Sequence, residues 1–129
     1  MTVSPVRAKH FKELVIWQKA MELVKAVYIL TAKFPSEEKF GLIAQMRRAA
    51  VSIPSNIAEG QARRGTREFL NFLSHASGSA AELETQLLLS VNLGHCSRSE
   101  TERAGSLLTE VQKMSAAIRL GLERNLASH

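Results

Sequence analysis

Arginine side chains gather in one short stretch of the sequence, at Arg63, Arg64 and Arg67. A guanidinium group presents planar N–H donors that bind phosphate oxygens in pairs. Because Gly60 and Gly65 bracket the first two arginines, the stretch predicts a turn from which long side chains reach a phosphate backbone. RNA or another nucleic acid is the partner that this chemistry indicates. The alternative interpretation is an ordinary solvated turn.

A second group of basic side chains lies in the first part of the chain, and we expect it to add phosphate contacts: Lys9, Lys12, Lys19 and Lys25. The chain has a net charge of +5, from 17 Lys and Arg against 12 acidic residues. Residues 1–35 carry six basic and two acidic side chains, whereas residues 66–97 carry one basic and three acidic. This uneven distribution favours an anionic partner for part of the surface.

Polar residues in the segment before the arginines have a structural interpretation. Arg48, Ser52, Asn56 and Glu59 follow one another at helical spacing. In an antiparallel pair of helices that turns near residue 62, Arg48 comes close to Glu82 of the following segment. We expect an Arg48–Glu82 ion pair that fixes the register of the two helices and takes no part in catalysis.

Residues that could catalyse a reaction or bind a metal ion are few and scattered. A di-iron bundle needs Glu-x-x-His pairs, and no Glu of this chain has a His three residues later. Arg124 and His129 have the spacing of some helical ribonucleases, but a terminal histidine is poorly fixed for proton transfer. Cys96 is the single cysteine. We expect no enzyme activity, no cofactor and no metal ion, and a minimal ribonuclease is the least favoured alternative.

The elements that position these side chains are helices. All 12 acidic residues are Glu, and Glu favours helix interiors whereas Asp favours caps and turns. Apolar spacings of three and four predict helices over about 11–33, 36–60, 66–93 and 99–125. Ser99 and Glu102 have the spacing of a capping box that opens the last helix. Short connections then predict a single domain over residues 1–129, an all-α antiparallel up-down-up-down four-helix bundle.

The buried face of each helix follows from the same spacing. In chain order the predicted faces are Leu14, Trp17, Met21, Val24 and Tyr28; Ile43, Met46, Ala50, Ile53 and Ile57; Phe69, Leu73, Ala76, Ala80, Leu83 and Leu87; and Leu108, Val111, Ser115, Ile118 and Leu122. Pro54 lies within the second face and removes the amide donor for the Ala50 carbonyl, so Ser52, Ser55 and Asn56 are expected to satisfy that oxygen. The small residues between 75 and 81 predict a close helix crossing.

Further apolar residues remain outside these faces: Val15, Ile16, Val27, Ile29, Leu30, Leu70, Leu88 and Leu89. One interpretation is a broad core, and the other is an interface, since large apolar patches are unusual on monomers. We expect a homo-oligomer.

No segment predicts a membrane span. The longest uncharged runs, 69–81 and 85–97, are shorter than the roughly 20 apolar residues that cross a bilayer. Residues 1–10 lack the apolar core of a signal peptide, and one cysteine cannot form an internal disulfide. A cytoplasmic protein is predicted.

The string SIPSNIAEG, residues 52–60, occurs together with FKELVIWQKA at 11–20 and GSAAELETQL at 78–87. These strings resemble a four-helix-bundle family that includes proteins encoded in intervening sequences of bacterial 23S ribosomal RNA genes. The resemblance implies a cytoplasmic bundle that assembles as a homopentamer. It also implies distant kinship with the accessory variability determinant proteins of diversity-generating retroelements, which bind nucleic acid and a reverse transcriptase.

These observations favour a non-enzymatic oligomeric helical protein that binds RNA or another nucleic acid. The alternative is a scaffold or accessory subunit that docks on another protein through the apolar faces of the first and third helices.

Overall fold

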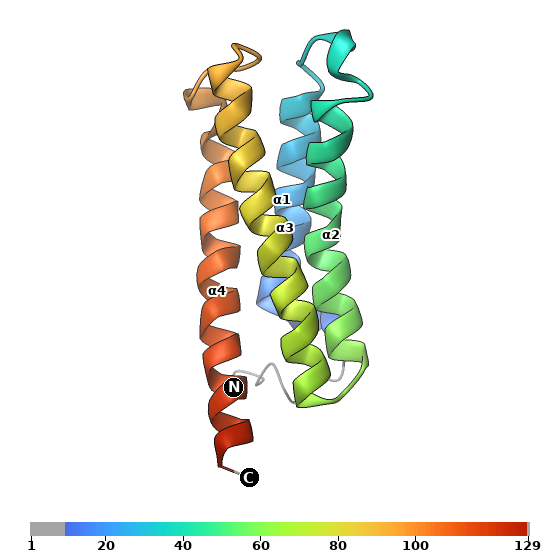
Figure 1. Cartoon of the computed structure of the whole chain (residues 1–129), viewed down its shortest axis with the longest axis vertical. Helices are drawn as coiled ribbons and strands as arrows, with labels where there is room; N and C mark the ends of the chain where they lie inside the picture. Colours follow the sequence, from blue (N-terminus) through green and yellow to red (C-terminus); the bar gives the residue numbers. More distant parts are fainter. Residues whose placement is uncertain (1–9, 129) are drawn as a thin grey trace.

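The computed structural model describes residues 10–128. Within this range it contains four α-helices and no strand: α1 (Val15–Thr31), α2 (Leu42–Ala62), α3 (Thr66–Asn92) and α4 (Glu102–Ala127). The helices lie side by side, and consecutive helices run in alternating directions (Figure 1). Each helix packs against two others, α1 on α2 and α4, and α3 on α2 and α4. The predicted all-α four-helix bundle is confirmed.

The first two helices begin later than the sequence pattern predicts. Phe11–Glu13 forms a separate 3-10 turn, because Leu14 has an extended backbone with φ −76° and ψ 124°. Ser36–Glu38 is also a 3-10 turn, and Gly41, at φ −104° and ψ −112°, separates it from α2. The predicted starts at residues 11 and 36 are therefore wrong, and these residues form the connections.

The predicted buried face of α1 is confirmed only at Leu14. Met21 and Tyr28 are 46% and 42% exposed, and Trp17 and Val24 are only partly buried. The other buried residues are Ile16, Ala20, Leu23, Val27, Leu30 and Thr31. Three residues that the pattern left outside, Ile16, Val27 and Leu30, thus belong to the core. The true face is the neighbouring apolar stripe, so α1 is rotated relative to the prediction.

The predicted faces of α2 and α3 are buried throughout, and in α4 only Ile118 is less than fully buried. Pro54 is a buried residue inside α2. Near it, the Ser55 hydroxyl donates to the Val51 carbonyl at 2.8 Å, and the Asn56 amide donates to the Ser52 carbonyl at 2.8 Å. These bonds reach the carbonyls of Val51 and Ser52 and not that of Ala50, so neither of them supplies the expected replacement donor for the Ala50 carbonyl.

Among the glycines of the described helices, Gly60 of α2 is the one whose place leaves no room for a side chain against another helix. A Cβ on Gly60 would lie 2.7 Å from the Phe72 Cβ, so only glycine fits there without a shift of the neighbours. Gly78 is exposed, and a Cβ on it would meet no atom within 4 Å. Gly78 therefore makes no close helix contact, but Ala76 and Ala80 of the same stretch are buried, and the Ser79 hydroxyl lies 2.8 Å from that of Ser52 on α2. Gly60 adds a close contact of α2 with α3 just before their turn.

Candidate nucleic-acid interface

The segment that joins α2 to α3 carries the predicted arginines, and we call residues 59–68 the arginine turn. Helix α2 ends at Ala62 and α3 begins at Thr66, so only three residues connect them. The turn is this short because Gly60 lets the end of α2 pack directly against the first turns of α3. The structure brings Arg63, Arg64 and Arg67 together at one end of the bundle, and all three are exposed.

Arg63 is partly engaged in contacts within the turn. One of its terminal nitrogens, Nη2, lies 3.0 Å from Glu59 Oε1, one helical turn earlier. Its guanidinium carbon lies 5.4 Å from the centre of the Phe72 ring, within the range of a cation–π contact. These contacts hold the planar group in place and partly balance its charge. Phe72 was not among the residues that the sequence pattern selected.

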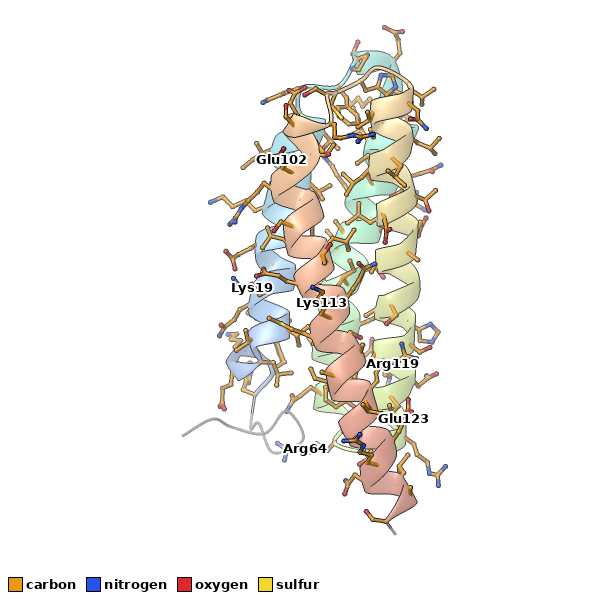
Figure 2. All side chains as sticks on the ribbon, turned by 90° about the vertical axis from the view of Figure 1, so that its left-hand side faces the viewer. Lys19, Arg64, Glu102, Lys113, Arg119 and Glu123 are labelled. Carbon is orange, nitrogen blue, oxygen red and sulfur yellow. The ribbon has the colours of Figure 1, made fainter. Side chains whose placement is uncertain are left out.

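Arg64 and Arg67 form no ion pair with any side chain of residues 10–128. Arg64 has φ 63° and is the single non-glycine residue with positive φ in that range. Such a conformation is strained for an L-residue and usually belongs to glycine or asparagine. Its amide donates to the Gln61 carbonyl at 3.2 Å, which closes the end of α2. Figure 2 shows Arg64 at the end of the bundle where α4 finishes.

Of the predicted lysines that the structure describes, only Lys12 lies toward this end, because the turn that contains it precedes α1 and contacts α2 (Figure 1). Lys9 lies outside the described residues. Lys12, in the turn before α1, and Lys25, on the exposed side of α1, form no ion pair within the described chain. Lys19 lies 3.7 Å from Glu22 and 3.8 Å from Glu110 of α4, so two carboxylates balance its charge. The described members of the second basic group are therefore spread from the turn before α1 to the middle of that helix.

The predicted polar network is formed only in part. The Ser52 and Ser79 hydroxyls lie 2.8 Å apart and link α2 to α3, and the Asn56 amide donates to the Ser52 hydroxyl at 2.9 Å. The expected Arg48–Glu82 ion pair is absent from the described chain, and both side chains are exposed. The Glu82 carboxylate instead accepts a long hydrogen bond, 3.5 Å, from the Gln86 amide.

Arg47, and not Arg48, is the arginine that crosses between helices. Its Nε donates to the Thr31 hydroxyl at 2.9 Å, and its Nη2 donates to the Tyr28 carbonyl at 3.4 Å. The guanidinium carbon lies 4.4 Å from the centre of the Tyr28 ring. Successive residues on a helix point about 100° apart, so this contact to α1 turns Arg48 away from the core. A register contact exists, but it joins α1 to α2.

The residues considered for catalysis remain dispersed. His95 Nε2 lies 2.8 Å from Glu38 Oε2, and burial raises the pKa of the Cys96 thiol, which disfavours the reactive thiolate. His129 lies outside the described residues. Residues 10–128 contain no group of three or more His, Cys, Asp or Glu side chains that could hold a metal ion. In the same range, no helix has the length and apolar character that a bilayer span requires.

The fold and the exposed arginine turn define a small antiparallel helical bundle with a cationic end. Residues 12–117 match the family model described as 23S rRNA-intervening sequence protein. The chain belongs to that family, so the predicted family resemblance is confirmed. A search of curated proteins finds no match. The homopentamer and the kinship with accessory variability proteins stay predictions.

Proposed function

We propose that this protein binds RNA through the arginine turn and does not cleave it. The observation that carries the proposal is the exposure of Arg64 and Arg67 without any counter-ion among the described residues. Arg64 follows the carboxyl end of α2, where a cation favours the helix dipole, but Arg67 lies in the first turn of α3, where it does not. Unpaired arginines on a short turn can approach a phosphate backbone. The name of the family, which refers to 23S rRNA, supports RNA as the nucleic acid.

Assembly of several copies strengthens this proposal. Met21 and Tyr28, seven residues apart on α1, and Val51 on α2 are exposed apolar side chains beside the half-buried Trp17 and Val24. Tyr28 contacts Arg47 of α2, so these residues follow the junction of the two helices. A second copy that covers this surface would make a homo-oligomer, and each copy would add one arginine turn. Several weak phosphate contacts would then act together.

The test compares wild type with the triple variant Arg63→Ala, Arg64→Ala and Arg67→Ala. The matched control, Lys33→Ala, Lys39→Ala and Arg98→Ala, removes the same charge from the opposite end of the bundle. Fluorescence anisotropy with a labelled RNA hairpin is measured at low and at moderate salt. We expect the arginine-turn variant to bind about tenfold more weakly or worse and its salt slope to fall by about two to three, because each lost phosphate contact removes about one unit.

The control variant is expected to keep most of its affinity. Equal losses of RNA affinity in both triple variants would show that net charge alone causes the effect, and they would contradict the arginine turn as the binding site. Unchanged affinity of the arginine-turn variant would contradict it directly. Shortened RNA after incubation, seen on a denaturing gel, would contradict the absence of cleavage and favour the ribonuclease.

A protein partner is the second candidate function, because the apolar surface of α1 and α2 suits a foreign helix as well as another copy. The exposed Leu88 and Leu89 of α3 supply further apolar area. Replacing Met21 and Val51 by Glu distinguishes the two occupants. We expect the mass in solution to fall to that of one 14.2 kDa chain if copies cover the surface. A wild-type chain that is already monomeric would leave a different protein as the occupant.

A further inference from the structure

A hollow of about 180 Å³ opens between α3 and α4, away from the arginine turn's own side chains. Its apolar floor includes Ile16, Ile57 and Val111 from three different helices. The hollow exists because small residues face one another across the two helices, among them Ala80 and Ala116. Neither helix fills the space, so the site is open in the folded chain.

One wall of this hollow is polar. The Ser77 and Ser115 hydroxyls lie 3.3 Å apart across the two helices, and Ser115 is only 4% exposed. Arg119 Nη1 donates to the Ser77 hydroxyl at 3.2 Å. Figure 2 shows Arg119 on the side of α4 that faces α3. The hollow is therefore apolar at its floor and carries hydroxyl groups and a guanidinium on one side.

Arg119 is half-buried, yet it forms no ion pair with any carboxylate of residues 10–128. A guanidinium has five N–H donors, and its bond to Ser77 leaves others directed elsewhere. A partly buried cation without a counter-ion is unusual, because removing charge from water is unfavourable unless a partner replaces the water. Among the described residues, no carboxylate lines the hollow.

We propose that this hollow binds a small organic carboxylate with an apolar body about the size of a benzene ring. The carboxylate would accept hydrogen bonds from Arg119 and from the serine hydroxyls, and the ring would rest on Ile16, Ile57 and Val111. Apolar cavities of about 150 Å³ accept benzene, so the volume fits a benzoate-sized ligand. An inorganic phosphate would leave the apolar floor uncovered, and a neutral ring would leave Arg119 without a counter-ion. The site is independent of RNA binding.

Calorimetric titration of the full chain with benzoate tests the proposal, with benzamide and inorganic phosphate as comparison probes. We expect benzoate to bind, and both comparison probes to bind about tenfold more weakly or worse, because one charge-assisted hydrogen bond has about this effect. Arg119→Gln should weaken benzoate binding by a similar factor. Arg124→Gln removes an exposed arginine that lies outside the lining of the hollow, and it should bind benzoate as wild type does.

A second variant keeps the test decisive if Arg119→Gln does not fold. Ala116 is exposed at the edge of the hollow, so Ala116→Leu narrows the space without touching the guanidinium. We expect it to fold, as judged by circular dichroism, and to lose benzoate binding. No binding of benzoate to wild type, equal binding of benzamide or phosphate, or unchanged benzoate affinity in Ala116→Leu would each overturn the proposal.

Discussion

The two ends of the bundle differ in how many of their charged side chains contact other groups of the protein. The arginine turn presents cations that mostly lack partners. The other end, formed by residues 32–41 and 93–101 and called here the double-loop end, holds some of its charges in contacts within the fold, although Lys39 and Arg98 are exposed and form no ion pair within the described chain. There the Glu38 carboxylate accepts hydrogen bonds from the Leu42 amide and contacts His95 Nε2 at 2.8 Å. Lys33 lies 3.9 Å from Glu100. At the double-loop end carboxylates bind groups of the fold, whereas at the arginine turn only Arg63 has a carboxylate partner among the described residues.

Backbone geometry follows the same division. At the double-loop end the residue with positive φ is Gly94, at 78°, and the amides of Gly94 and His95 donate to the carbonyls of Val91 and Ser90. This is the Schellman arrangement that ends a helix without strain. At the arginine turn the equivalent conformation falls on Arg64. Glycine would adopt this conformation without strain, so the presence of arginine there agrees with the proposed role of the turn in binding.

The largest expected change in stability concerns the packing that makes the arginine turn short. Gly60→Ala places a methyl group 2.7 Å from the Phe72 Cβ and 3.1 Å from a ring carbon of Phe69. We expect the free energy of unfolding to fall by about 1–3 kcal/mol, because the two helices must move apart. Chemical denaturation of the variant and of wild type measures this difference in the free energy of unfolding.

Gly78→Ala is the matched control, since the new methyl group meets nothing within 4 Å. Alanine favours a helix interior over glycine, so this variant should gain about 0.5–1 kcal/mol. A Gly60→Ala protein as stable as wild type would show that the close approach of α2 and α3 is not needed for the turn.

The next effect separates stability from binding at the turn itself. Arg64→Gly relieves the positive φ and should raise the free energy of unfolding by about 1 kcal/mol, because glycine adopts this conformation freely. The same change removes an unpaired cation and should weaken RNA binding. Denaturation and anisotropy on one sample measure both. Arg67→Gly, in the first turn of α3, is the contrast, since glycine inside a helix should lower stability. A loss of stability in Arg64→Gly would contradict the strain argument.

A smaller effect concerns the start of the fourth helix at the double-loop end. The Ser97 amide donates to the Glu100 carboxylate at 2.9 Å, and the Glu100 amide donates to the Ser97 hydroxyl at 3.2 Å. Ser97→Ala should lower the free energy of unfolding by about 1 kcal/mol. Ser99→Ala, whose hydroxyl contacts only that of Ser97, should change it by less than about 0.5 kcal/mol. Equal shifts of the melting temperature in the two variants would show that this capping box does not stabilise the protein.

The same box shows how far local spacing predicts the structure. The pattern Ser-x-x-Glu occurs at both 97–100 and 99–102, and the prediction chose the second. The structure uses the first, because residues 99–101 form a 3-10 turn before α4 begins at Glu102. Spacing established that a cap exists near this point. Which of two overlapping patterns forms it depends on how the chain leaves Gly94, and the sequence does not specify that path.

Helix rotation limits the prediction in the same way. Helices α2 and α3 have one apolar stripe each, so their buried faces follow from spacing. Helix α1 has two neighbouring stripes, and the one with Trp17 and Tyr28 has the larger side chains, yet the core takes Leu23 and Val27. The arginine turn was predictable because two glycines mark it. The absence of the Arg48–Glu82 pair could not be predicted in this way, because it depends on a rotation of α2 that Arg47 sets through its bond to Thr31.

The smallest expected effect tests the double-loop end through pH. The hydrogen bond with His95, and then the one from the Leu42 amide, hold the pKa of Glu38 below its ordinary value. The unfolded chain therefore takes up a proton at a higher pH than the folded chain does, and falling pH favours unfolding. The stability that this carboxylate contributes is complete above the ordinary pKa of a glutamate and is lost as the pH falls through the lowered value. Glu38→Gln should consequently be less stable than wild type near neutral pH and should approach it in acid. Glu37→Gln, which changes the exposed neighbouring carboxylate, is the control. Parallel pH profiles of the melting temperature for the two variants would show that the stability of the double-loop end does not depend on the Glu38 contacts.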